Sequence, residues 1–322
     1  MDKQTEPNAA GNGHKANGTA TKATHKAIDP IWTIYTLADA YKPRDPIQYV
    51  VSGLFALPSL SIVYGPPGCM KTMLLTDMAA CIASGSPWLE PLPNLAKRTA
   101  KKTLKCPVLW MDFDNGSRVM HERLEAAGRV RNMPEDAPLY YASMPDPWLD
   151  MGNPVSAKIL EHHARSLGAK AIIVDNLGNV SGKADENSAD MGKVMSHFRR
   201  LAEETGAAVI VVHHQRKSNG TSGRAGETLR GHSSIEAAID LALLIERENQ
   251  ADQLKIKSTK TRGVDVSPFG AMFTFTHKLP TTELKTMRFF GFEVEDLSSD
   301  KAIRRAILEA VKEQPEVNQG DL

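Results

Sequence analysis

Short apolar runs alternate with amphipathic segments along the chain between residues 60 and 217. In the segments at 71–85, 155–168 and 191–206, apolar residues recur three and four positions apart, as they do in helices with one buried face. The runs between these segments are continuously apolar, which is typical of strands buried on both faces of a parallel sheet. The alternation predicts an α/β fold, with a mostly parallel sheet flanked by helices on both faces. The predicted strands are 60–64, 107–116, 139–144, 171–177 and 207–217.

The pattern changes in the last third of the chain. Residues 235–248 predict a helix followed by a strand. Residues 254–263, 270–279 and 284–295 alternate apolar and polar positions, which is typical of strands with one solvated face. We therefore expect an antiparallel C-terminal extension of the sheet.

The two ends of the chain differ from the rest. Residues 1–27 contain almost no large apolar side chain, so they predict a disordered tail. Residues 28–298 are expected to form one domain. Residues 299–322 read as an amphipathic helix followed by a proline break, similar to the start of a winged helix-turn-helix that is cut off before a recognition helix.

Composition narrows the possible surroundings and partners of the protein. The 322 residues carry 39 Lys and Arg against 38 Asp and Glu, so any nucleic-acid binding must come from a local basic patch. Cys69, Cys81 and Cys106 have no zinc-finger spacing, and their odd number fits a reducing compartment. No apolar run reaches the ~18 residues needed to span a bilayer. We expect a cytoplasmic protein with no membrane partner.

A phosphate-binding loop is predicted between the first strand and the helix at 71–85. The sequence GPPGCMKT lies between a strand and a helix, which is the context that makes a Walker A motif credible. Backbone N–H groups of the loop and the start of the helix would surround phosphates. Met70 replaces the second glycine of the motif, and the alternative is a simple Gly/Pro turn before a lysine. The predicted nucleotide-binding residues are Gly65, Pro66, Pro67, Gly68, Cys69, Met70, Lys71 and Thr72.

Carboxylates follow two of the other predicted strands. Asp175 ends AIIVD, where it would ligate Mg²⁺ together with the hydroxyl of Thr72, or else cap a turn. Asp112 and Asp114 lie two residues apart, so on a strand both would project from the same face. One of them could then polarise a water molecule. We favour Asp114 because it lies nearer the end of the strand, and helix capping by the DNGS turn is the alternative.

Histidine and basic side chains complete the candidate chemistry. His213 and His214 end a strand on opposite faces, so at most one can contact a phosphate or a water, and either could be a core histidine. Zinc is disfavoured there because no cysteine is close in sequence. Lys260 and Arg262 share one side of a strand end, where they would reach an anion on another molecule as an arginine finger does, or lie in solvent at a sheet edge.

With these motifs in order, the chain resembles the RecA-like P-loop ATPase core of the RepA/DnaB type of hexameric helicases, and most of all the RepA-like ATPases. The resemblance runs from about Val50 to Glu295. It implies nucleotide contacts by Lys71 and Thr72 and a metal ligand in Asp175. The segments that carry it are GPPGCMKT, VLWMDFDNGSRVMHERL, AIIVDNL, DENSADM, LAEETGAAVIVVHHQRK, LRGHSSIEAAIDLALL and STKTRG.

The resemblance also implies the remaining catalytic roles. The family's catalytic glutamate falls on Asp114, one methylene shorter, and its sensor histidine falls on His214. Its lysine–arginine pair, which acts on a neighbouring subunit, falls on Lys260 and Arg262. The glycine-rich loop after the last parallel strand matches the region that faces the channel in such rings. Its candidate DNA-phosphate contacts are Lys217, Arg224 and Arg230.

The expected cofactors are ATP and Mg²⁺, and the expected partners are further copies of the chain in a hexameric ring and single-stranded DNA. The expected function is that of an ATP-hydrolysing helicase or translocase in the replication of a plasmid, phage or mobile element. The alternative is a regulatory or scaffold ATPase in which ATP binding drives assembly and hydrolysis is slow, which the short side chain of Asp114 favours.

Overall fold

The computed structural model describes residues 32–92, 100–184, 190–214, 233–247, 251–263, 265–292 and 294. The chain divides into two compact units, Met1–Pro46 and Ile47–Leu322. In the first unit, the described part contains the short helix α1 (Leu37–Ala40). Thr36 and Asp39 cap it reciprocally, each side chain accepting from the backbone N–H of the other. The predicted tail (1–27) and the C-terminal helix (299–322) lie outside the described residues.

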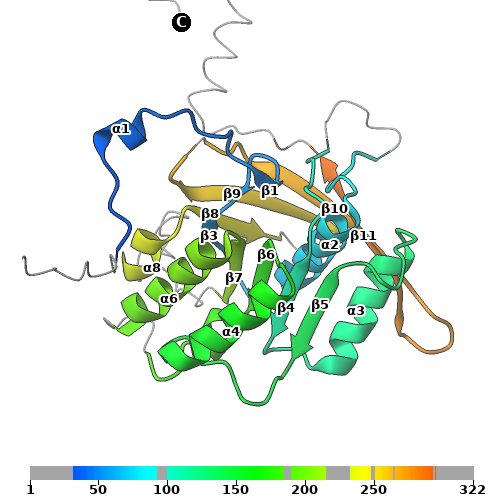
Figure 1. The fold of residues 1–322 in the computed structure, drawn as a ribbon. Helices are drawn as coiled ribbons and strands as arrows, with labels where there is room; N and C mark the ends of the chain where they lie inside the picture. The colour runs from blue at the N-terminus through cyan, green and yellow to red at the C-terminus, as the bar shows by residue number, and fades with distance from the viewer. Residues whose placement is uncertain are drawn as a thin grey trace, which may run out of the picture. The chain divides into compact units, whose positions relative to one another are not determined.

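The second unit is built on a nine-stranded sheet in the order β11-β10-β9-β8-β3-β7-β6-β4-β5 (Figure 1). The strands from β8 to β5 in this order pair in parallel, and β9, β10 and β11 add an antiparallel extension, so the predicted α/β class is confirmed. A separate two-stranded sheet pairs β1 (Tyr49–Val51) with β2 (Phe55–Ala56). The strands of the large sheet are β3 (Ser59–Gly65), β4 (Val108–Asp112), β5 (Leu139–Ser143), β6 (Ala171–Asp175), β7 (Ala208–His214), β8 (Leu241–Glu246), β9 (Gln253–Thr261), β10 (Phe269–His277) and β11 (Leu284–Phe292).

Helices cover both faces of this sheet. One apolar cluster packs α2 (Lys71–Ser84) and α3 (Ser117–Arg129) against one face. A second cluster packs α4 (Pro154–Ser166), α5 (Leu177–Val180), α6 (Asp190–Thr205) and α8 (Ser233–Ala238) against the other, with α4 and α6 side by side (Figure 1). Strands β3, β6 and β7 are buried along almost their whole length because both of their faces are covered.

The topology decides where the candidate residues meet. Parallel strands end at the same edge of a sheet, so the ends of β3, β4, β6 and β7 bring the predicted side chains to one place. In register, Gly65 lies opposite His214, and Asp175 lies opposite Asp112. Among the described residues, no helix is both long and apolar enough to cross a lipid bilayer.

Candidate active site

The turn from β3 into α2 has the shape of a phosphate loop. A Cβ placed on Gly65 would lie 2.3 Å from the carbonyl oxygen of Ile245, so only glycine fits at the start of the turn. Gly68 has φ +78°, with open space where a side chain would project. Met70 has φ 66°, the left-handed conformation that glycine provides in the usual motif. An L-residue there costs roughly 1–2 kcal/mol, so the departure seen in the sequence preserves the backbone shape at an energetic cost.

The start of α2 provides positive charge beside this loop. Its N-cap residue, Met70, makes no side-chain capping hydrogen bond, and the helix dipole directs partial positive charge to this end. The Lys71 ammonium is buried and donates to the carbonyl oxygens of Gly65 and Pro66, each at 3.0 Å. Lys71 also donates to the sulfur of Cys69 at 3.7 Å. A cation held by these neutral groups of its own loop is well placed to turn toward a phosphate.

Thr72, at the start of α2, and Asp175, at the end of β6, are joined directly, although β7 separates β6 from β3, the strand that leads into α2. The Thr72 hydroxyl donates to Asp175 Oδ2 at 2.6 Å. Asp175 is fully buried, and in the described structure its Oδ1 has no hydrogen-bond partner. Burial raises the pKa of the Asp175 carboxyl from 3.8 to about 6; the Thr72 hydrogen bond opposes this rise, and Asp114 adds to it. A hydroxyl and an orphaned carboxylate oxygen fit Mg²⁺, which prefers oxygen ligands.

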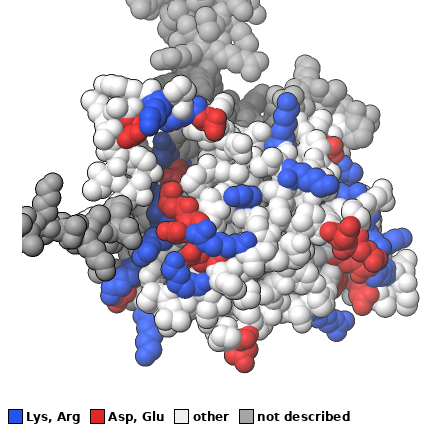
Figure 2. All heavy atoms as spheres, in the orientation of Figure 1, with Lys and Arg blue, Asp and Glu red and all other residues white. Residues whose placement is uncertain are grey.

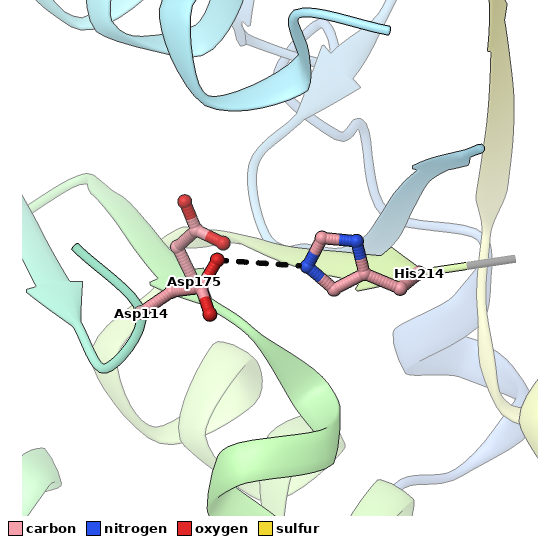
Figure 3. A group of neighbouring side chains, drawn as sticks. All are labelled: Asp114, Asp175 and His214. Carbon is pink, nitrogen blue, oxygen red and sulfur yellow. Dashed lines mark ion pairs between the residues drawn. The ribbon is translucent and has the colours of Figure 1, made fainter. Parts of the chain in front are cut away.

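Asp112 and Asp114, which sequence analysis could not separate fully, have different surroundings. Asp112 is buried at the end of β4 and accepts hydrogen bonds from the Gly116 N–H (3.0 Å) and the Ser143 hydroxyl (2.6 Å). The capping contacts of the DNGS turn are therefore made by Asp112. Asp114 is 43% exposed, and its Oδ2 lies 3.7 Å from Nε2 of His214 (Figure 3). Asp114 thus has its carboxylate available at the edge where Asp175 lies.

The two histidines at the end of β7 also differ in their surroundings. His213 is buried within the sheet, whereas the His214 side chain is 41% exposed and faces Asp114. His214 also pairs in register with Gly65, the first residue of the phosphate loop. Of the pair, His214 is therefore the one that reaches the candidate site.

Sequence analysis missed Arg123 and Asn115. Arg123 donates to Asn115 Oδ1 at 2.7 Å. Burial lowers the pKa of Arg123, while Asp175 and Asp112 nearby favour its charged form. Arg123 lies three residues after the buried Met120, on the inward side of α3. A cation on the inward side of the helix that follows an acidic strand end was a usable signal.

Lys260 and Arg262 share one side, as predicted, and that side faces the end of α8. Lys260 donates to the carbonyl oxygen of Glu236, and Arg262 donates to that of Ala237. Arg262 also lies 3.7 Å from Asp240. Burial and the neighbouring Arg262 lower the pKa of Lys260. Carbonyl groups at a helix C-terminus attract cations, so within one chain this pair is held against α8.

The register places Lys260 and Arg262 near the edge where the parallel strands begin, opposite the edge where these strands end at the phosphate loop. Thr261 pairs with Leu241, and Leu241 pairs with Ser61. Gly65 follows Ser61 by four residues along β3, a separation of about 13 Å along the strand. The two cations therefore do not lie at the phosphate loop of their own chain.

The predicted DNA contacts, Lys217, Arg224 and Arg230, lie outside the described residues, as do residues 185–189 of the DENSADM loop. Among the described residues on the face shown in Figure 2, acidic and basic side chains are interspersed.

The family match found by comparison with known proteins agrees with this geometry. Residues 33–220, more than half of the chain, match the AAA domain family AAA_25. A stretch of 105 residues is 29% identical to the Gene 65 protein of Mycobacterium phage D29, covering 31% of this chain and 45% of that protein, so this chain aligns with less than half of its relative. A solved ATPase domain is similar over 67% of this chain and 81% of its own length, with 11% identity and a TM-score of 0.49. From the family match and the strand order around the phosphate loop, the chain belongs to the AAA domain family and has a RecA-like P-loop ATPase core.

Proposed function

We propose that this protein is a Mg²⁺-dependent ATPase motor that assembles into a ring and moves on single-stranded DNA, as a helicase or translocase. The observation that carries the ATPase part is the 2.6 Å hydrogen bond from Thr72 to Asp175 at the start of α2. It joins the two predicted metal ligands beside an uncapped helix N-terminus, although they are far apart in sequence. The phage origin of one relative supports only the phage or mobile-element part of the proposed context, and the role in replication is our proposal.

Each side chain of the site has a role in hydrolysis. The phosphate-loop N–H groups and the α2 N-terminus would hold the β- and γ-phosphates, and Lys71 would exchange its loop carbonyls for phosphate oxygens. Thr72 and Asp175 would hold Mg²⁺, which when bound neutralises charge that develops on the phosphates. Asp114 would accept the proton of the attacking water, and His214, 3.7 Å from Asp114, would hold that water or the γ-phosphate.

A cavity next to the loop would receive the nucleoside. It has a volume of about 310 Å³ and lies between the start of α2, α3 and the end of β10. Its walls are largely apolar, as a purine ring requires, with a cation and a carboxylate at one side. The side chains that line it are Met70, Met73, Val119, Glu122, Arg123, Phe275, His277 and Leu284.

Lys260 and Arg262 would complete the site of a neighbouring copy. Their place at the opposite sheet edge from their own loop supports action between subunits. Asp240 would position Arg262, because it accepts two hydrogen bonds from Arg199, at 2.7 and 2.8 Å, and lies 3.7 Å from Arg262. In this proposal the neighbouring copies form a hexameric ring, and the ring acts in the cytoplasm.

The first experiment measures ATP turnover with and without single-stranded DNA, together with the mass of the assembly. Lys71→Ala is expected to abolish ATP binding, and Arg262→Ala is expected to leave ATP binding nearly intact while suppressing turnover. The control is Arg129→Ala, which removes an exposed arginine on α3 that pairs only weakly, at 3.6 Å, with Glu125. Normal turnover in Lys71→Ala would refute the loop assignment.

Mixing the two inactive variants tests action between subunits. An interface that joins an intact phosphate loop to an intact Arg262 forms in about one quarter of random head-to-tail contacts in an equal mixture. Partial recovery of turnover on mixing is expected. If the mixture stays inactive while both variants assemble together, Arg262 does not act on a neighbour.

The DNA contacts require their own test. Replacing Lys217, Arg224 and Arg230 with glutamine should weaken single-stranded DNA binding and reduce its dependence on salt, because fewer counterions are released from the DNA. An unchanged salt dependence would remove these residues from the DNA interface. ATP turnover without DNA should be nearly unchanged in the triple variant.

A second candidate is a regulatory or scaffold ATPase that hydrolyses slowly. The observation that favours it is Asp114, whose carboxylate is one methylene shorter than the glutamate expected there and would hold the attacking water less closely. ATP-dependent assembly with little turnover, with or without DNA, would select this alternative.

A further inference from the structure

Three side chains at the end of the sheet form a compact set of metal-ligand groups. Asp114, Asp175 and His214 each offer one ligand atom, and these atoms all lie within 4.8 Å of one another (Figure 3). His214 Nε2 and Asp114 Oδ2 are 3.7 Å apart. Around tetrahedral Zn²⁺, with bonds of about 2.0–2.1 Å, ligand atoms lie about 3.4 Å apart. Small rotations of the two exposed side chains would therefore bring the three atoms onto one ion.

The third member of the set is already prepared for a ligand. Asp175 is fully buried, Thr72 holds its Oδ2, and in the described structure no partner reaches its Oδ1. A buried carboxylate oxygen without a partner is costly to maintain unless something binds it. This observation is independent of the distances between the three ligand atoms.

The surrounding charge also favours a cation. The buried carboxylate of Asp112 lies opposite Asp175 in register, which adds a third acidic group to this edge of the sheet. Lys71 and Arg123 act on Asp175 only through their charge, because in the described structure their hydrogen bonds go to neutral groups, those of Lys71 to carbonyls and a thiol of its own loop and that of Arg123 to an amide oxygen.

We propose that the nucleotide-free protein binds one divalent transition-metal ion, of the Zn²⁺ or Co²⁺ class, directly through Asp114, Asp175 and His214. The imidazole ligand decides the class, because Mg²⁺ prefers oxygen ligands whereas an imidazole with carboxylates suits Zn²⁺ and its neighbours. Zinc was disfavoured in the sequence because no cysteine is close to the histidines. The fold instead brings two carboxylates from other strands, leaving a fourth position for water.

This site overlaps the one proposed for Mg²⁺ and the attacking water, so the transition metal and Mg·ATP should exclude each other. The overlap rests on the proposed ATPase function, but binding of the metal to the free protein does not. Zn²⁺ would then hold the protein in a state that cannot turn over ATP.

The test titrates Zn²⁺ into nucleotide-free protein by calorimetry and records the visible spectrum with Co²⁺. One equivalent should bind, with a Co²⁺ spectrum that lacks sulfur charge-transfer bands. His214→Ala and Asp114→Asn should each weaken binding by more than about 100-fold, since even indirect supports of a metal ligand contribute 10–100-fold. His162→Ala, which removes an exposed histidine on α4, is the control and should bind as the wild type does.

Lys71→Ala separates this inference from the proposed function, because it should lose ATP but keep the metal. Equal Zn²⁺ affinity in the wild type and His214→Ala, or no binding to the wild type, would overturn the metal site. If ATP binding still depends on Lys71 in that case, the ATPase proposal stands without it. Added Mg·ATP should displace Co²⁺ from the wild type, and simultaneous full occupancy of both would refute the overlap.

Discussion

Replacing Asp175 with asparagine should stabilise the nucleotide-free protein while abolishing its ATP turnover. Burial raises the pKa of this carboxyl from 3.8 to about 6. One pKa unit corresponds to about 1.36 kcal/mol, so ionised Asp175 disfavours folding by about 3 kcal/mol. Asparagine has the same shape, stays neutral, and its carbonyl oxygen can still accept the hydrogen bond from Thr72.

The pH dependence of this stability difference follows from the pKa values of the Asp175 carboxyl in the unfolded and folded chains. Below pH 3.8 the carboxyl is protonated in both folded and unfolded chains, so its stabilising contribution is fully present. That contribution is lost as the pH rises toward about 6 and stays absent above it. The advantage of Asp175→Asn should therefore be about 0.5 kcal/mol at pH 4 and reach about 3 kcal/mol at pH 8.

Urea unfolding at pH 4, 6 and 8, in chelator and without nucleotide, measures this advantage. The same comparison in a His214→Ala background removes the neighbouring imidazole. An Asp175→Asn variant that is equally or less stable than its parent at pH 8 in both backgrounds would refute the reasoning. Mg·ATP should reverse the order of stability, because only the ionised carboxylate binds the metal well.

Three further predictions concern the site and its support. Asp114→Glu should preserve or raise the turnover number at saturating ATP, since it carries the carboxylate further toward the phosphates; a collapse in turnover would assign Asp114 a structural role. Gly65→Ala should weaken binding of a fluorescent ATP analogue by about 100-fold, because its Cβ would lie 2.3 Å from the Ile245 oxygen; unchanged affinity would show that the loop adapts. Arg131→Met should lower the free energy of unfolding by about 3–5 kcal/mol in a denaturant titration, because it removes the cation of a 2.5 Å ion pair and leaves the buried carboxylate of Asp77 without it. A loss below about 1 kcal/mol would contradict a buried pair.

Local sequence was sufficient for much of this site. The parallel strands were predictable because burial on both faces imposes continuous apolar runs, and the phosphate loop because a strand, two glycines and a helix start follow in a fixed order. Asp175 followed from its place at a strand end, whereas the choice of His214 over His213 came from the family resemblance. The family resemblance then assigned roles that spacing alone left open.

Other features depend on three-dimensional rotation and register, which local sequence does not determine. Asp112 and Asp114 are both at the end of β4, and only the turn that follows decides which carboxylate caps it. Arg123 comes near Asp175 and Asp112 only through the way α3 packs on the sheet. The placement of Lys260 near the start of β8 follows from antiparallel pairing, which reverses the direction of β9 relative to its neighbour.

Because that reversal places Lys260 and Arg262 away from the phosphate loop of their own chain, the number of complete catalytic centres would depend on how the subunits are arranged. If every complete catalytic centre combines a loop from one chain with the basic pair of the next, an open row of subunits always contains one centre fewer than it has chains. Closing the row into a circle supplies the missing centre. Turnover per chain should therefore rise with concentration as rows lengthen, and a lone subunit, however well folded, should bind ATP and leave it uncleaved.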